Sequence, residues 1–144
     1  MDGGNGASAA NLNGGRSPRV LLVEDHDDTR RVTSRLLGLL GCAVTEVKDL
    51  AHARWALAGA GTEPFDLLVC DLRLPDGDGR DLMRQAAGCG PVAGIAVSGE
   101  AGRGAVERSL AAGFAAHLVK PIVWGELEAA VRRLVPLGRS STSS

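Results

Sequence analysis

The sequence predicts an α/β fold: a doubly wound, five-stranded parallel sheet of order 2-1-3-4-5, with helices on both faces. Two observations predict it. Five short apolar segments alternate with helical patterns along residues 19–136. The first, third and fifth of these segments are continuously apolar, which is typical of strands that are buried on both faces of a parallel sheet. Repeated alternation of strand and helix implies right-handed crossovers and three layers.

Each element follows from a local pattern. Strands are expected at the apolar segments Val20–Val23, Ala43–Val47, Leu67–Cys70, Ala93–Val97 and Ala116–Val119. The first helix is predicted from a stripe at helical spacing, formed by Val32, Leu36, Leu39 and Leu40, with Asp27 and Asp28 before it as candidate N-caps. Four later helices are predicted from Ala53, Ala56 and Leu57, from Leu82, Met83 and Ala86, from Val106 and Leu110, and from Leu127, Val131 and Leu134. Glycines fall where helices should end, at Gly41, Gly59, Gly61, Gly88 and Gly113.

One domain is expected over residues 19–136, because the chain has 144 residues and 44% of them are hydrophobic. Residues 1–18 are rich in small polar residues and predict a flexible N-terminal tail, and the Ser-rich residues 137–144 predict a flexible C-terminal tail. A net charge of −1 lacks the basic excess that nucleic-acid binding requires. The sequence has no membrane-length apolar run and no signal-peptide pattern, and its three cysteines show no disulfide or zinc spacing. We therefore expect a cytoplasmic protein with no nucleic-acid and no membrane partner.

Polar residues stand where four of the five predicted strands end. They are Glu24 and Asp25 after the first strand, Asp71 after the third, Ser98 after the fourth and Lys120 after the fifth. Ligands of open parallel sheets bind beyond these carboxyl ends, and the order 2-1-3-4-5 makes the first and third strands neighbours. Three converging carboxylates repel one another and require a cation, and oxygen ligands suit Mg²⁺. Asp71 is then the expected nucleophile toward a phosphoryl group, whose oxygens Lys120 and Ser98 would contact.

This ordered set of residues resembles the receiver domain of two-component response regulators. Asp71, Pro75 and Gly79 match that family's Asp-x-x-x-Pro-x-x-x-Gly pattern, and the similarity covers residues 19–134. The resemblance implies a flavodoxin-like receiver fold with Asp71 as the phosphoacceptor. It implies that Mg²⁺ is held by Glu24, Asp25, Asp71 and the backbone carbonyl of Arg73. It also implies that Ser98 is the switch hydroxyl, that Lys120 contacts the phosphoryl group, and that the Lys120–Pro121 bond is cis, as is common in the family.

Several residues allow two interpretations. His117 stands three residues before Lys120, where the family usually carries an aromatic switch residue; it is either a rotating imidazole or a half-buried strand residue without that role. Arg73 and Glu100 form either an ion pair that gates the site or two solvated side chains. For the remaining residues that stand out, a structural role is preferred over a functional one. We expect surface positions for His26 and His52, partial core cover for Trp55 and Trp124, and a core-facing position for Cys70.

The leading functional hypothesis is a phosphorelay signalling domain rather than an enzyme. A histidine kinase or phosphotransfer protein would phosphorylate Asp71 with Mg²⁺, Ser98 would move, and a changed face at the fourth and fifth helices would be read by an unknown protein partner. Self-phosphorylation from small donors and autodephosphorylation are expected. One alternative is a Mg²⁺-dependent phosphohydrolase with an aspartyl nucleophile, although Arg73 stands where such enzymes need a second Asp. Another is a receiver that serves only as an interaction module. Residues 98–121 resemble receivers of hybrid histidine kinases, so stand-alone and hybrid origins are both open.

Overall fold

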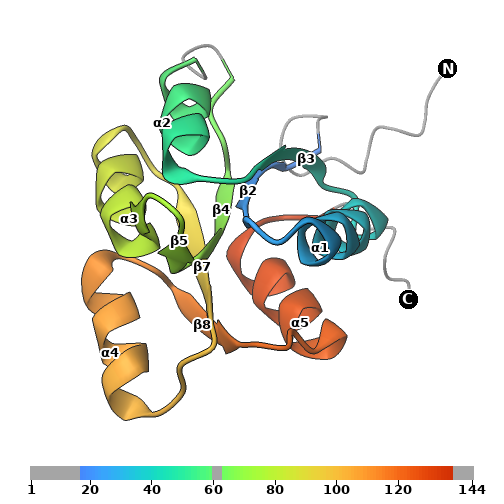
Figure 1. Cartoon of the computed structure of the whole chain (residues 1–144). Helices are drawn as coiled ribbons and strands as arrows, with labels where there is room; N and C mark the ends of the chain where they lie inside the picture. The colour runs from blue at the N-terminus through green and yellow to red at the C-terminus, as the bar shows by residue number, and fades with distance from the viewer. Residues whose placement is uncertain (1–16, 60–62, 138–144) are drawn as a thin grey trace, which may run out of the picture.

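A five-stranded parallel sheet forms the centre of the computed structural model, which describes residues 17–59 and 63–137 (Figure 1). Its strands are β2 (Arg19–Val23), β3 (Ala43–Val47), β4 (Leu67–Asp71), β7 (Ala93–Ser98) and β8 (Ala116–Val119). They are hydrogen-bonded in the order β3-β2-β4-β7-β8, and all four pairings are parallel. Counted along the chain, this is the predicted order 2-1-3-4-5, which is confirmed.

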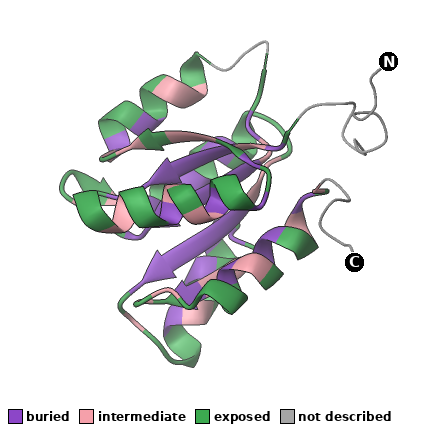
Figure 2. Ribbon diagram, turned by 90° about the vertical axis from the view of Figure 1, so that its right-hand side faces the viewer, coloured by how far each residue is buried: buried purple, intermediate pink, exposed green. Residues whose placement is uncertain are grey.

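Helices cover both faces of the sheet. They are α1 (Asp27–Leu39), α2 (Leu50–Ala58), α3 (Gly79–Gly88), α4 (Arg103–Ala112) and α5 (Trp124–Leu134). One core cluster joins Leu37 of α1 and Val131 of α5 to the sheet, and the other joins residues of α2, α3 and α4 to its opposite face. Figure 2 shows the central strands β2, β4 and β7 as buried elements between these helical layers, whereas the residues of the edge strand β3 are exposed or half-buried. Neighbouring residues of β4 alternate between the two clusters, as strand geometry requires.

The N-cap of helix α1 lies one residue before the two expected caps, Asp27 and Asp28. Its N-cap is His26, whose Nδ1 accepts the Thr29 N–H at 3.3 Å, so the prediction that Asp27 or Asp28 caps the helix was wrong. Both aspartates lie in the first turn, where their charges favour the helix dipole. The predicted apolar stripe was also wrong in part. Val32 and Leu39 are 59% and 74% exposed, because the helix turns Thr33, Leu37 and Leu40 toward the sheet.

A two-stranded antiparallel hairpin that the sequence pattern did not predict lies between β4 and α3. It consists of β5 (Arg73–Leu74) and β6 (Gly77–Asp78). Asp76 at its turn fastens the hairpin to α2. The two carboxylate oxygens of Asp76 accept the N–H groups of Leu50 and Ala51, at 2.8 and 3.0 Å. Gly77 has a φ of +149°, and a Cβ there would lie 2.7 Å from Leu50 Cδ1. A side chain at this position would therefore displace the Leu50 side chain, and the positive φ would strain any residue other than glycine.

We expect Asp76→Ala to lower the free energy of unfolding by about 1 kcal/mol, the usual cost of losing a helix cap. Two N–H groups in the first turn of α2 lose their acceptor in this variant. Chemical denaturation of Asp76→Ala beside Asp81→Ala, a change at an exposed acid of α3, measures the difference. Equal midpoints for the two variants would show that Asp76 does not cap α2.

The two tryptophans were both expected to cover part of the core, and they differ in exposure. Trp55 is 81% exposed, so the prediction that it covers the core was wrong, whereas Trp124 is 38% exposed.

Pro18 is buried and its carbonyl oxygen accepts the Ala43 N–H at 2.8 Å, while Leu137 packs against the core cluster that contains Leu37 and Val131. Of the predicted tails 1–18 and 137–144, residues 1–16 and 138–144 lie outside the described residues, as does Gly61. Within the described residues, no helix has the length and apolarity that a membrane crossing needs.

The three cysteines differ in exposure, which predicts their reactivity. Cys70 is fully buried, as expected, and burial raises the pKa of its thiol; burial also raises the pKa of Cys42, to about 11. Cys89 is exposed. Because the thiolate is the reactive form, we expect a thiol reagent at neutral pH to modify Cys89 rapidly and the other two only after unfolding. Mass spectrometry of native and denatured samples checks this, and rapid triple labelling of the native protein would contradict it.

Candidate functional site

Three carboxylates meet at the carboxyl ends of β2 and β4. Glu24, Asp25 and Asp71 each offer an oxygen within 4.8 Å of the others. Glu24 is 3% exposed and Asp71 is 6% exposed, whereas Asp25 is exposed. Because β2 pairs directly with β4, the order of the strands in the sheet brings these side chains to the same edge of the sheet. The structure therefore gathers the three predicted acids into one cluster.

Lys120 joins this cluster from the end of β8. Its Nζ lies 3.0 Å from Asp71 Oδ2 and 3.1 Å from Glu24 Oε1. The Lys120–Pro121 peptide bond is cis, as the resemblance implied. Burial raises the pKa of Glu24, and the charge of Asp71 adds to this, although hydrogen bonds from the His26 N–H and Lys120 oppose the rise. Burial lowers the pKa of Lys120, but its bonds to Asp71 and Glu24 outweigh that and raise it.

The backbone around Asp71 is held tightly. The Arg73 N–H donates to Asp71 Oδ1 at 3.1 Å, so each carboxylate oxygen of Asp71 has a donor. Gly79 follows the hairpin, and a Cβ there would lie 2.5 Å from the Asp71 carbonyl oxygen and 2.7 Å from Cys70 Sγ. Only glycine fits so close to the strand end. This close approach explains why the Asp-x-x-x-Pro-x-x-x-Gly motif that begins at Asp71 ends with a glycine, Gly79.

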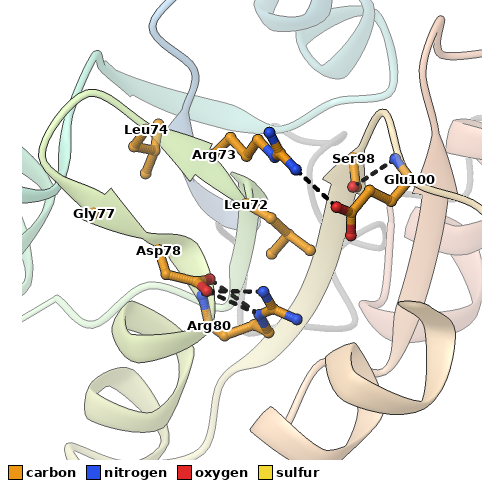
Figure 3. Close-up of a pocket in the computed structure, with 8 residues that line it drawn as sticks. All are labelled: Leu72, Arg73, Leu74, Gly77, Asp78, Arg80, Ser98 and Glu100. Carbon is orange, nitrogen blue, oxygen red and sulfur yellow. Dashed lines mark hydrogen bonds and ion pairs between the residues drawn. The ribbon is translucent and has the colours of Figure 1, made fainter. Parts of the chain in front are cut away.

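Ser98 ends β7, the strand that pairs with β4, and it lines a cavity at this end of the sheet. This cavity of about 290 Å³ is lined by Ser98, Glu100 and the hairpin residues Arg73 and Asp78, among others (Figure 3). Ser98 is 3% exposed, and its Oγ accepts the Glu100 N–H at 2.9 Å. The Glu100 carboxylate pairs with Arg73 at 2.8 Å, so the two side chains do form an ion pair, and its gating role stays a prediction. The Arg73 side chain remains 83% exposed, and ion pairs this exposed contribute little to stability.

His117 is placed away from the carboxylates, on the α4 side of β8. Its Nδ1 lies 2.7 Å from Ser109 Oγ, and its Nε2 lies 3.0 Å from the carbonyl oxygen of Glu100. Ser109 is fully buried in α4. The sequence analysis did not single out Ser109, although a serine on the apolar face of a helix signals a hydrogen-bond partner.

Arg30 is a further residue that the sequence analysis missed. Its Nη1 donates to the carbonyl oxygen of Glu24 at 3.0 Å, and its Nη2 pairs with Asp27 at 2.7 Å. Arg30 thereby ties the first turn of α1 to the end of β2, next to the carboxylates. An arginine on a predicted helix face gives no sign of such a role, because its reach to a backbone carbonyl depends on where the strand ends.

The chain matches a family model described as the response regulator receiver domain, over residues 20–132. The chain belongs to the response regulator receiver domain family. Two curated relatives share 35% identity with it. One is the KDP operon transcriptional regulatory protein KdpE of Escherichia coli, over 125 residues, which are 87% of this chain and 53% of that protein. The other is the response regulator protein PilR of Pseudomonas aeruginosa, over 112 residues, which are 76% of this chain and 24% of that protein.

A similar segment also occurs within a much longer sensory/regulatory protein. The sensory/regulatory protein RpfC of Xanthomonas campestris is 31% identical over 117 residues, which are 78% of this chain and 16% of that protein. The chain thus spans about half or less of the length of these curated relatives. Among solved structures, the non-phosphorylated HemR receiver domain of Leptospira biflexa is 29% identical, with a TM-score of 0.73, covering 84% of this chain and 96% of that one. These comparisons place the chain among the signalling domains of two-component systems.

Proposed function

We propose that this receiver domain accepts a phosphoryl group on Asp71 from a phosphohistidine of a histidine kinase or phosphotransfer protein. The observation that carries the proposal is the surroundings of Asp71. Its carboxylate is nearly buried, lies within one cluster with Glu24 and Asp25, and contacts the ammonium of Lys120. A buried carboxylate that lies beside two others and an ammonium group is suited to receive an anionic phosphoryl group when a metal ion held by the same carboxylates balances the charge.

The donor set fits Mg²⁺. Three carboxylate oxygens within 4.8 Å of one another form a hard, all-oxygen site, to which the backbone carbonyl of Arg73 would add a fourth ligand. Repulsion from Asp71 contributes to the raised pKa of Glu24, which is the strain that a divalent cation would relieve. When bound, Mg²⁺ would neutralise charge on the transferring phosphoryl oxygens.

The chain's own residues would orient the reacting groups. The Arg73 N–H on Oδ1 and the Lys120 ammonium on Oδ2 fix the plane of the Asp71 carboxylate. One Asp71 oxygen would form the new bond to phosphorus while the bond from phosphorus to the donor imidazole nitrogen breaks. Lys120 would then contact a phosphoryl oxygen, and Ser98 would donate its hydroxyl proton to another. The same site supports self-phosphorylation from small phosphodonors and slow autodephosphorylation.

Two surfaces suit the proposed partners. A groove of about 490 Å³ next to Lys120, lined by Val32, Leu36 and Ile122 among others, is suited to a helix of the phosphodonor protein, because it adjoins the acceptor. Exposed apolar residues on α4, on β8 and at the start of α5 are suited to the partner that reads the phosphorylated state. They are Leu110, Val119, the N-cap residue Val123, and Trp124. We place the domain in the cytoplasm, either as a stand-alone regulator or as part of a hybrid kinase.

The direct test is to incubate the protein with Mg²⁺ and a small phosphodonor such as acetyl phosphate. We expect one phosphoryl group per chain, borne by Asp71, and no reaction after Mg²⁺ is chelated. Intact-mass measurement detects the adduct, and borohydride reduction followed by peptide mapping locates it. An unmodified protein, or a phosphoryl group on another residue, would overturn the proposal. Steady turnover of phosphomonoesters would favour the phosphohydrolase alternative instead.

The Arg73–Glu100 pair is expected to lengthen the lifetime of the phosphorylated state. The pair bridges the hairpin and the loop after β7, beside the site, and would hinder attack by water (Figure 3). We expect Arg73→Asn to raise the autodephosphorylation rate several-fold and Glu100→Ala to raise it less. Decay of the phosphorylated protein is followed after removal of the donor. Arg84→Asn, at an exposed Arg–Asp pair on α3, is the matched control, and rates equal to this control would end the gating hypothesis.

A further inference from the structure

The guanidinium of Arg30 has three oxygen partners, one for each of its nitrogens. Nη1 donates to the carbonyl oxygen of Glu24, directly after β2, at 3.0 Å. Nη2 pairs with Asp27 in the first turn of α1 at 2.7 Å, and Nε lies 3.5 Å from the carboxylate of Glu46 in β3. The Arg30 side chain is only 15% exposed. Its planar group is therefore fixed in orientation between α1 and the first two strands of the chain (Figure 1).

Every polar group of Glu24 has a hydrogen-bond or ion-pair partner. Its N–H donates to the carbonyl oxygen of Val47 in β3 at 3.1 Å. Its carboxylate oxygens contact the Lys120 ammonium at 3.1 Å and accept the His26 N–H at 3.0 Å. The remaining group is the carbonyl oxygen, and Arg30 is its donor. Because Glu24 is buried, losing this donor would leave a polar group in a place where unmade hydrogen bonds are costly.

The carbonyl oxygen that Arg30 binds belongs to the peptide group between Glu24 and Asp25. Asp25 is exposed, so its direction toward the other two acids depends on the backbone that carries it more than on packing around its side chain. Rotation of this peptide group would turn the Asp25 carboxylate relative to those of Glu24 and Asp71. The hydrogen bond from Arg30 opposes such a rotation.

The positive charge of Arg30 is offset by its own partners. A guanidinium near three clustered carboxylates would repel a divalent cation that binds them. Asp27 and Glu46 both contact the guanidinium, so two negative charges lie against its single positive charge. Arg30 thus supplies a hydrogen bond to the backbone of the site without leaving an uncompensated positive charge beside it.

We propose that Arg30 is a positioning residue for the metal site: it holds the peptide group between Glu24 and Asp25 so that their carboxylates face one Mg²⁺ together with Asp71. The proposal rests on the proposed function, in which these acids hold the ion. Groups that orient metal ligands raise metal affinity without contacting the metal, because binding then requires less ordering. A role through charge alone predicts the opposite sign, since removing a nearby cation would strengthen Mg²⁺ binding. A role in the fold alone predicts no change in Mg²⁺ affinity.

Titration with Mg²⁺, followed by the backbone amide chemical shifts around Asp25, measures the affinity without any phosphoryl chemistry. We expect Arg30→Met to weaken Mg²⁺ binding about tenfold, as is typical when a group that orients a metal ligand is lost. Arg30→Lys keeps the charge, but one ammonium cannot replace three guanidinium nitrogens, so we expect a smaller, several-fold loss. Arg31→Met is the matched control, because Arg31 forms an exposed pair with Asp28 on the same helix; its affinity should equal that of the wild type.

Phosphorylation by acetyl phosphate gives a second measurement. The Mg²⁺ concentration for the half-maximal rate should rise in Arg30→Met by the same factor as the affinity falls, and saturating Mg²⁺ should restore the wild-type rate. Melting temperatures recorded in parallel identify a variant that does not fold, and Arg30→Lys is the milder change.

The outcomes separate the two proposals. A wild type whose amide signals do not respond to Mg²⁺ would overturn the proposed metal site, and the positioning role with it. A wild type that binds Mg²⁺, with Arg30→Met at equal or higher affinity, would overturn only the positioning role. Arg30→Lys at the wild-type affinity would overturn it too, because any cation would then suffice.

Discussion

The substitution Asp71→Asn is expected to abolish binding of beryllofluoride, with a loss of affinity beyond the roughly 100-fold range that a titration can follow. The amide cannot supply the anionic oxygen that bonds to beryllium, and it turns an N–H₂ group or a weaker acceptor toward Lys120, which lies 3.0 Å from Asp71 Oδ2. It also removes one of the three clustered carboxylates. Calorimetric titration in Mg²⁺ measures the change.

Asp81→Asn is the matched control for this experiment, because it neutralises an exposed aspartate of α3 that pairs with Arg84. Its affinity for beryllofluoride should equal that of the wild type. Retained binding in Asp71→Asn would mean that another group accepts the phosphoryl mimic, and the assignment of the acceptor would have to be abandoned.

The second large effect is expected for Lys120→Met. In the absence of Mg²⁺ this variant should lose on the order of 2 kcal/mol of unfolding free energy, because the buried carboxylates of Asp71 and Glu24 lose their cation. Burial already raises the pKa of Glu24, and the hydrogen bond from Lys120 is one of the interactions that oppose the rise. Saturating Mg²⁺ should remove most of the deficit, since the metal takes over the neutralising role.

Lys48→Met provides the control, because Lys48 is exposed and is the chain's other lysine. It should change stability by no more than about 0.5 kcal/mol, with or without Mg²⁺. Denaturant titrations of both variants in Mg²⁺ and in chelator give the four free energies. A Lys120→Met deficit that Mg²⁺ leaves unchanged would show that the lysine stabilises the fold by packing and not through its charge.

The fold and the clustering of the site residues could be predicted from the sequence. The fold follows from the periodicity of apolar residues, and the clustering follows from the order of the strands in the sheet. Continuously apolar segments identified β2, β4 and β8, and the rule for carboxyl ends of parallel strands brought Asp71, Glu24 and Lys120 together. The assignment of Asp25 to the same cluster followed from its place beside Glu24. These inferences needed no knowledge of side-chain conformation.

The parts that could not be predicted depend on local geometry. The β5–β6 hairpin has too few residues for a period, and the role of Asp76 depends on the approach of α2, a distant element. The N-cap at His26 could not be predicted because histidine is an uncommon N-cap residue. The two aspartates that follow it are common N-cap residues, so the cap was assigned to them. The contact between His117 and Ser109 links two elements whose spacing follows only from how α4 packs on β8.

The construction of the site across β2, β4 and β8 has a consequence for folding. Lys120 and Asp71 are 49 residues apart in sequence, and their contact requires that β7 be inserted between their strands. Contacts of such long separation repay their loop-closure entropy only when most of the chain is in place. Competence to bind Mg²⁺ should therefore arise late during refolding, after the sheet has closed. A partly folded domain would then lack the phosphoacceptor site that we propose.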